Sequence, residues 1–302
     1  MSLYTVPDFP LFRDIIIEDK NLFDSYFNNI QPKACQLTFN NLFSWRRTEK
    51  TKISKIDTTL VLISKDKTNN YFLPLLNYEK KDLTDEYILI LRWLKERQGE
   101  AEIKYIDDTL LLKIDKNKFN IIEDKSSYDY IYLTKDLIGL KGRKYDSKRN
   151  HIKYFEKNSS YIYEELNSDN IRESFRFEGE WCDMEKCSLS QKLLDEKTAI
   201  NEMLDNFYKL KIKGGVIKID GRIKALTIVE RLNKDTFLVN IEKANPKIRG
   251  LYQAINQCFC KESMQEFKYV NREEDLGIEG LRKAKLSYSP VEMVRKYRIS
   301  LI

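Results

Sequence analysis

The 302-residue sequence has little glycine and no long apolar run. Only one of its ten glycines, Gly99, lies before residue 139. Because glycine supplies the positive φ of phosphate loops and tight catalytic turns, we expect such features in the second half. No stretch approaches the ~20 apolar residues of a membrane-spanning helix, and residues 1–14 lack a signal-peptide pattern. The sequence therefore predicts neither an integral membrane protein nor a Sec-exported one, but a cytoplasmic protein.

Cysteine and histidine are also scarce. Five cysteines are an odd number in a chain without a signal peptide, so we expect free thiols in a reduced compartment, each a small buried hydrophobe. The spacings Cys182–Cys187 and Cys258–Cys260 match no zinc motif, and His151 is the only histidine, so no metal is predicted. There is no P-loop, dinucleotide-binding glycine motif or Gly-x-Ser-x-Gly. These absences exclude nucleotide hydrolysis and dinucleotide redox chemistry, and argue against a serine hydrolase.

The composition is nevertheless that of a folded protein. A hydrophobic fraction of 42% and an aromatic fraction of 12% can bury a large core, and the length suits about two domains. The net charge of +6 is modest, so the distribution of charge matters more than its sum.

The second half has a clear order of elements. An amphipathic helix is predicted over 195–210, ended by Gly214–Gly215, and Asp220–Gly221 is typical of a tight hairpin. The remaining elements are strands 216–219, 223–230, 236–241 and 267–270, helices 249–261 and 278–285, and an extended stretch from 286.

The first half repeats this order more weakly. We expect strands 52–56, 59–64, 71–75, 103–106 and 110–114, a helix over 84–97, and a connection over 115–135. Each half thus places three antiparallel strands before a helix that crosses to a parallel strand. The predicted fold is α+β, with two tandem layered domains, 1–125 and 126–302, built on mixed, mostly antiparallel sheets.

Residues 141–157 are strongly basic, with seven Lys and Arg against two acids. The pattern from Ser147 predicts a helix whose apolar edge is Ile152 and Phe155. One interpretation is a phosphate-binding surface for tRNA, coenzyme A or a lipid headgroup; a solvated helix is the alternative. His151 is either structural or a base. The candidate phosphate ligands are Arg143, Lys144, Arg149 and Lys153.

The segment 242–256 connects a strand to a helix, where backbone N–H groups and the helix dipole favour anions. Lys247, Arg249 and Gly250 reinforce this prediction. Acetyltransferases of the GNAT fold bind the coenzyme A pyrophosphate here with Arg/Gln-x-x-Gly-x-Gly/Ala, but Tyr252 replaces the final small residue. The tyrosine argues against ordinary coenzyme A binding, and a plain helix start is the alternative.

A run of charges follows the strand predicted at 267–270. Asn271 and Arg272 come directly after it, and Glu273, Glu274 and Asp275 follow. Ligands of open sheets bind beyond the carboxyl ends of strands, so these residues are candidates for substrate positioning. The alternative is that the acids only complement the start of the next helix.

Four stretches resemble one bacterial family: 38–45 (TFNNLFSW), 142–151, 242–244 (EKA) and 271–277. It is the uncharacterised soluble group classed with the C-terminal domain of phosphatidylglycerol lysyltransferases. The resemblance implies two tandem GNAT domains, akin to the Fem peptidoglycan aminoacyltransferases. It also implies transfer of an aminoacyl group from aminoacyl-tRNA to an amine or hydroxyl. Because the sequence has no membrane-spanning region, a lipid acceptor is not expected, although peripheral membrane contact stays open.

For such a reaction we expect Glu230 or Glu242 as the base and Lys243 as the group that stabilises the oxyanion. Tyr252, Asn256 and the run from Asn271 to Asp275 would position the donor or acceptor. No permanently bound cofactor is expected, and tRNA is the expected partner. Two alternatives remain: an acyl-coenzyme A N-acyltransferase that uses residues 247–252, and a non-catalytic module that binds tRNA or protein.

Overall fold

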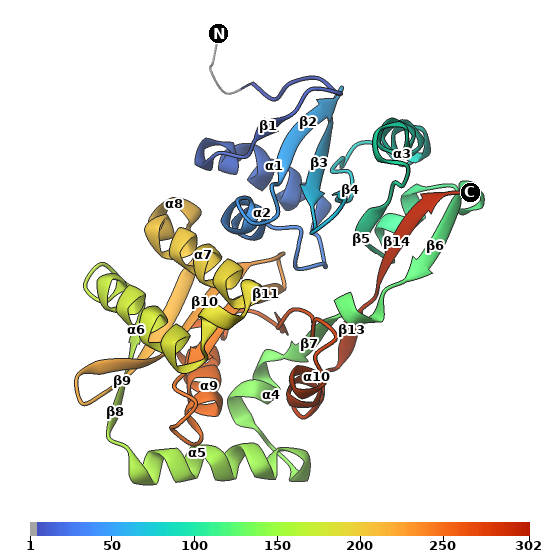
Figure 1. Ribbon diagram of the computed structural model, residues 1–302. Coiled ribbons are helices and arrows are strands. Elements are labelled where there is room, and N and C mark those ends of the chain that lie inside the picture. The colour runs from blue at the N-terminus through green and yellow to red at the C-terminus, as the bar shows by residue number, and fades with distance from the viewer. Residues whose placement is uncertain (1–4) are drawn as a thin grey trace. The chain divides into compact units, whose positions relative to one another are not determined.

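The computed structural model describes residues 5–302, and the chain divides into two compact units. The first unit extends to Asp129 and includes Val294–Ile302, and the second is Tyr130–Met293. Each unit holds one seven-stranded sheet with helices on it (Figure 1). The predicted α+β class with mixed, mostly antiparallel sheets is confirmed.

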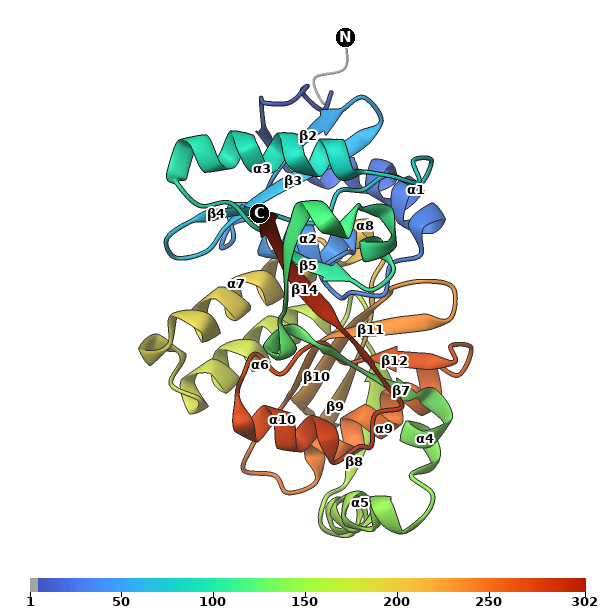
Figure 2. The same ribbon diagram turned by 90° about the vertical axis from the view of Figure 1, so that its right-hand side faces the viewer.

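The first sheet has the order β1-β2-β3-β4-β5-β14-β6. Neighbouring strands are antiparallel except for the parallel pair β4 and β5. Figure 2 shows α3 lying across this unit. Its elements are β1 (Arg13–Asp14), α1 (Lys20–Ile30), α2 (Phe39–Trp45), β2 (Lys52–Ile56), β3 (Thr59–Lys65), β4 (Asn70–Phe72), α3 (Thr84–Gln98), β5 (Ile103–Asp107), β6 (Phe119–Glu123) and β14 (Lys296–Leu301), with short 3-10 helices at 17–19, 110–113, 116–118 and 125–127.

The second sheet has the order β13-β7-β12-β11-β10-β9-β8. The strands β8 to β11 are antiparallel, β12 runs parallel to β11, and β7 is antiparallel to β12. The elements are β7 (Asp129–Leu133), α4 (Thr134–Gly139), α5 (Asp146–Asn158), β8 (Tyr161–Glu165), α6 (Ile171–Met184), α7 (Gln191–Asp205), α8 (Phe207–Leu210), β9 (Lys213–Ile219), β10 (Arg222–Arg231), β11 (Thr236–Ala244), α9 (Leu251–Ser263), β12 (Tyr269–Asn271), α10 (Glu279–Leu286) and β13 (Glu292–Val294), with 3-10 helices at 143–145 and 187–189.

Several local predictions were wrong. Residues 110–113 form a 3-10 helix instead of a strand, because Asp107 Oδ1 accepts the N–H groups of Thr109 (2.9 Å) and Leu110 (3.0 Å) and turns the chain. The expected connection 115–135 contains β6 and β7. Gly214 and Gly215 lie inside β9 and do not end a helix. A Cβ at Gly214 would lie 2.7 Å from the Thr227 carbonyl oxygen and one at Gly215 2.5 Å from the Tyr163 hydroxyl, so the close packing around β9 requires glycine at both positions.

The last strand belongs to the first unit, whereas the prediction placed residues 294–302 in the second domain. β14 pairs with β5 on one side and β6 on the other (Figure 1). Its first residue, Lys296, is fully buried, and its ammonium donates to Asp129 Oδ1 at 2.6 Å and Gln36 Oε1 at 2.7 Å. The sheet thus needs β14 to hold β5 and β6 together.

Two faces of β11 meet different helices in the second unit. α9 packs on one face, with Leu251, Ala254 and Ile255 in a core cluster, while α6 and α7 lie together over the sheet (Figure 1). β11 pairs with β12 only over Thr236–Leu238. Its following residues run on beyond β12, so this side of β11 is where a site can form.

Cys182 and Cys187 form a disulfide, so the prediction of five free thiols was wrong for this pair. The turn after α6 contains Lys186 at φ 55° and brings the two Cα atoms to 5.1 Å. Cys35, Cys258 and Cys260 are not part of a disulfide within the described residues.

None of the helices within residues 5–302 combines the length and apolar character required to cross a membrane.

Candidate active site

Glu242 lies on β11 beyond Leu238, the last residue of this strand that pairs with β12. Its Oε1 accepts a hydrogen bond from Arg272 Nη2 at 2.8 Å, and its Oε2 accepts one from Asn256 Nδ2 at 2.8 Å. Arg272 follows β12 and Asn256 lies on α9, so three consecutive elements of the fold converge on one carboxylate. The structure therefore brings together three of the residues that the sequence singled out.

Arg272 is held in an aromatic surrounding. Its guanidinium carbon is 4.8 Å from the ring centroid of Tyr288 and 5.8 Å from that of Tyr132. Burial disfavours its charge, but Glu242 and the two tyrosines raise the pKa of Arg272 above its ordinary value. Its Nη1 is buried without a hydrogen-bond partner among the described residues. A buried nitrogen of a permanent cation thus has no acceptor within residues 5–302.

A second cation lies close to the same tyrosine. Lys148, on α5, has its ammonium 4.4 Å from the Tyr288 ring centroid. It is half-buried and forms no ion pair within the described part of the chain. Burial, and then the charge of Arg272, lower the pKa of Lys148. Sequence reasoning counted Lys148 among the basic residues without selecting it, because its approach to Tyr288 spans 140 positions and is not visible in local spacing.

Lys243 lies on the opposite face of β11 from Glu242, as neighbouring strand residues must. Its ammonium is 2.7 Å from Glu196 of α7 and 3.3 Å from the ring centroid of Trp181 of α6. The side chain is 3% exposed. The structure does not bring Lys243 to the Glu242 centre, so the predicted pairing of these two neighbours in one mechanism is not seen.

Glu178 of α6 is the group that sequence reasoning missed. It is 1% exposed, 4.0 Å from the Lys243 ammonium, and neither carboxylate oxygen has a hydrogen-bond partner among the described residues. Burial raises the pKa of Glu178 to about 7, against the lowering effect of Lys243. A signal was present in the sequence: Glu178 shares the helical spacing of Ser174, Phe177 and Trp181, which together form the buried face of α6.

Glu230 and Glu242 do not share a site. Because β10 and β11 are antiparallel, the ends of these strands lie at opposite ends of the ladder: Glu230 pairs with Leu238, and Glu242 with Thr227. Glu230 Oε1 accepts from Asn240 Nδ2 at 2.9 Å and lines a separate pocket, described below.

The predicted helix at the basic segment is confirmed as α5. Arg149 is used internally, because it donates to the carbonyls of Leu140 and Gly142 and pairs with Asp146. Arg143, Lys144 and Lys153 are exposed, with Lys144 3.9 Å from Asp136. Three of the four candidate phosphate ligands are therefore on the surface.

Gly250 has a packing role. It has φ 89° at the start of α9, and a Cβ there would lie 2.1 Å from the carbonyl oxygen of His151 on α5. Tyr252 turns its hydroxyl inward, 3.3 Å from Trp181 Nε1, and Arg249 lies over the ring of Tyr154. Lys247 N bonds to Asn245 Oδ1 at 3.0 Å. α5 thus packs directly against the turn where a GNAT enzyme would hold a pyrophosphate.

The acids after β12 mainly build the turn that presents Arg272. Asn271 Oδ1 accepts from the Glu273 N–H at 2.8 Å, and Lys285 donates to the Glu274 carbonyl at 2.6 Å. Burial opposes the ionisation of Asp275, but hydrogen bonds from Arg282, Tyr130 and Gly277 hold its pKa at about 2. Arg272 is the residue of this run that bonds to Glu242.

Chemically, the Glu242 centre offers a carboxylate that can take a proton, and an N–H edge of Arg272 that can stabilise negative charge. Such a combination suits attack of a nucleophile on a carbonyl group. The candidate centre lies in the second unit, where the glycine distribution placed it.

Comparison with known proteins agrees with this fold. A conserved protein of unknown function from Bacteroides thetaiotaomicron is 35% identical, with a TM-score of 0.87 over 96% of this chain and 99% of that chain. L-PGS from Bacillus licheniformis is 14% identical, with a TM-score of 0.60 over 99% of this chain and 94% of that one. A tandem GNAT protein from the clavulanic acid biosynthesis pathway is 8% identical, with a TM-score of 0.53 over 95% and 97% of the two chains.

The two distant matches show the fold alone, and they confirm the predicted tandem GNAT architecture. Residues 27–300 match the family model described as phosphatidylglycerol lysyltransferase, C-terminal. The match spans nearly the whole chain and both units, and it supports an acyltransferase-like function. The chain therefore belongs to the family of the phosphatidylglycerol lysyltransferase C-terminal domain.

Proposed function

We propose that this protein is an aminoacyltransferase that moves an aminoacyl group from aminoacyl-tRNA to an amine or hydroxyl acceptor. The observation that carries the proposal is the Glu242–Arg272–Asn256 centre at the separation of β11 and β12. Family membership supports the reaction class, and the arrangement of donors and acceptors supports its chemistry.

In the proposed reaction, the acceptor nitrogen or oxygen attacks the carbonyl carbon of the aminoacyl ester. Glu242 takes the proton that the nucleophile loses, while the buried Nη1 of Arg272 donates to the oxyanion. The bond between that carbon and the terminal ribose oxygen then breaks, and the proton passes from Glu242 to this oxygen. The products are the aminoacylated acceptor and free tRNA.

The basic helix α5 supplies the proposed tRNA surface. Arg143, Lys144 and Lys153 are exposed on or just before it, while Lys148 faces Tyr288 and the Arg272 centre. Positive side chains therefore lie both on the exposed surface of α5 and next to the reacting groups, and lysine and arginine are the residues that bind a phosphate backbone. This protein resides in the cytoplasm under the proposal, where charged tRNA is available.

Coenzyme A is the less favoured donor. The Gly250 backbone, which would approach a pyrophosphate in a GNAT enzyme, is packed against the His151 carbonyl, an oxygen that repels phosphate. Tyr252, whose hydroxyl points inward to Trp181, also places an aromatic ring where GNAT enzymes have a small residue.

The test is a transfer assay with the full chain. Total tRNA charged with labelled amino acids is incubated with cell-extract acceptors, and loss of label from tRNA and its appearance in a product are both measured. We expect Glu242→Gln to lower the rate about 10²–10⁴-fold and Arg272→Lys about 10²–10³-fold. Glu262→Gln removes one exposed carboxylate from α9, the helix that carries Asn256, and should leave the transfer rate unchanged. Full activity of Glu242→Gln would refute the assignment.

A competition experiment separates the donors. Charged tRNA should bind with a steep salt dependence, and the double variant Lys144→Gln/Lys153→Gln should reduce the log–log salt slope by about 2. The matched control is Lys192→Gln/Lys209→Gln, which removes two exposed charges elsewhere in the second unit. Saturable acetyl-coenzyme A binding without tRNA binding would instead favour acyl-coenzyme A chemistry.

A further inference from the structure

A pocket of about 390 Å³ lies at the hairpin end of β10 and β11, away from the Glu242 centre. It is formed within the second unit by the start of β9, the β10–β11 hairpin and the loop before β12. Its volume falls near the lower end of small-molecule sites, roughly 300–1,000 Å³. The pocket therefore suits a compact ligand.

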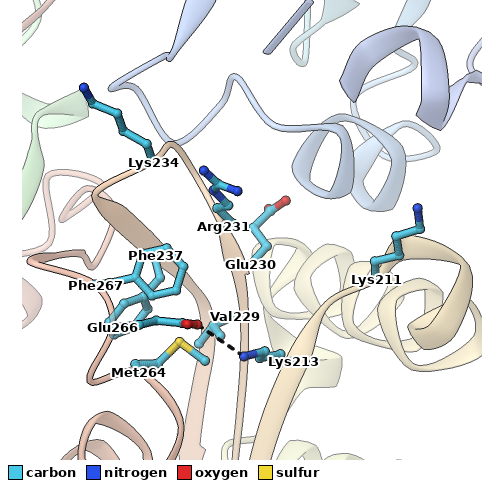
Figure 3. A pocket seen from close by; sticks show the side chains of 10 residues that line it. All are labelled: Lys211, Lys213, Val229, Glu230, Arg231, Lys234, Phe237, Met264, Glu266 and Phe267. Atoms are coloured by element: carbon cyan, nitrogen blue, oxygen red, sulfur yellow. Dashed lines mark ion pairs between the residues drawn. The ribbon is translucent and has the colours of Figure 1, made fainter. Parts of the chain in front are cut away.

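The floor is apolar and partly aromatic. Val229, Phe237 and Met264 are buried, and Phe267 is partly exposed. The rings of Phe237 and Phe267 meet edge to face at 5.8 Å (Figure 3). Of these four side chains Phe267 is the one with exposed ring surface, so a flat or apolar group can lie against Phe267 and leave its polar part at the rim.

The rim carries four cationic side chains and two carboxylates. Lys213 is 3.6 Å from Glu266. Arg231 is exposed and donates through Nε to the Asn233 carbonyl at 3.2 Å, while its terminal nitrogens form no ion pair within residues 5–302. Figure 3 shows Lys211 and Lys234 extending away from the floor, and the exposed Lys211 adds charge at the entrance. An excess of positive charge over an aromatic floor favours an anion with a planar body.

We infer that this pocket binds a nucleotide, with the base on the Phe267 side of the floor and the phosphate between Lys213 and Arg231. The shared chemistry is a nucleobase joined to a phosphate through a ribose, carried either by a free mononucleotide or by the end of an RNA strand. Stacking on an aromatic side chain and cations on the phosphate are the two contributions that such a ligand uses. The inference does not depend on the proposed transfer reaction, since Glu242 and Arg272 take no part in it.

The test is titration calorimetry of the full chain with AMP, with adenosine and inorganic phosphate as partial ligands. We expect saturable AMP binding, weaker binding of either part, and a loss of about three- to tenfold with Lys213→Gln or Arg231→Gln. Lys209→Gln, an exposed lysine of α8 outside the pocket, is the charge-matched control. Glu266→Gln should tighten binding about two- to fivefold, because it removes the carboxylate that competes for Lys213. A merely structural role of Glu266 would not produce this gain.

The source of the nucleotide follows from one further titration, with a short oligoribonucleotide that ends in adenosine. Tighter binding than AMP, with the same response to the variants, identifies an RNA end; equal or weaker binding identifies the free nucleotide. Inorganic phosphate that binds as tightly as AMP overturns the nucleotide assignment. Absence of saturable AMP and oligonucleotide binding at millimolar concentration, or binding unaffected by Lys213→Gln and Arg231→Gln, overturns the site.

Discussion

Replacement of Gly250 by alanine tests whether this glycine serves packing. A side chain at φ 89° costs about 1 kcal/mol. The new Cβ would also lie 2.1 Å from the His151 oxygen and 3.0 Å from Phe155 Cβ, and because the first of these is backbone, α5 must shift. Such overpacking costs about 1–3 kcal/mol, so we expect a total loss of about 2–4 kcal/mol in the free energy of unfolding.

Thermal unfolding followed by circular dichroism measures this loss. For a unit of this size, about 2–4 °C per kcal/mol gives a fall of roughly 4–16 °C in Tm. Gly221→Ala is the matched control, because Gly221 has φ 72° in a tight turn of the same unit but a Cβ there would meet nothing within 4 Å. It should lower Tm only by the cost of the backbone conformation. If Gly250→Ala is no more destabilising than Gly221→Ala, the packing argument is wrong, and an anion-binding role for Gly250 regains support.

Three further predictions concern buried charge and thiols. Burial raises the pKa of Glu178 from 4.5 to about 7, so this carboxyl ionises at lower pH in the unfolded chain than in the folded one. The free energy of unfolding should therefore fall as pH rises from about 4.5 to 7. Urea titrations at pH 5 and pH 8 measure this fall, and Glu178→Gln should reduce it by up to about 3 kcal/mol. Lys296→Met should cost about 3–5 kcal/mol because it leaves the Asp129 carboxylate buried without its cation, and Lys296→Met/Asp129→Leu should recover part of that loss in the same titration. With the disulfide Cys182–Cys187 intact, the denatured protein should expose three reactive thiols to a thiol reagent, and more after reduction; five before reduction would contradict the pairing.

Local patterns predicted the local structure of both units. Asp57 and Asp220 both adopt φ 51° in tight hairpin turns, as the sequence indicated, and the helices over 84–98 and 251–263 precede parallel strands. Strand pairing over long distances was not predictable in this way. β7 and β14 join their sheets through partners more than 100 residues away, and α6 was missed altogether.

The candidate site shows the same division. Glu242, Asn256 and Arg272 could be chosen one by one, because each follows or lies within a recognisable element. Their convergence depends on the parallel register of β11 and β12, which no spacing reveals. Without α6, sequence reasoning could not know that Lys243 already has carboxylate partners and an aromatic ring beside it.

The place of β14 has a consequence for the order of folding. The strands of the first sheet are not synthesised together: β5 and β6 leave the ribosome early, whereas β14, the strand between them, follows only after the whole second unit. Until then, β5 and β6 each present an unpaired edge to other chains. The nascent first unit should therefore wait, partly open, while the second folds, and a chain interrupted before Lys296 should aggregate through its N-terminal half.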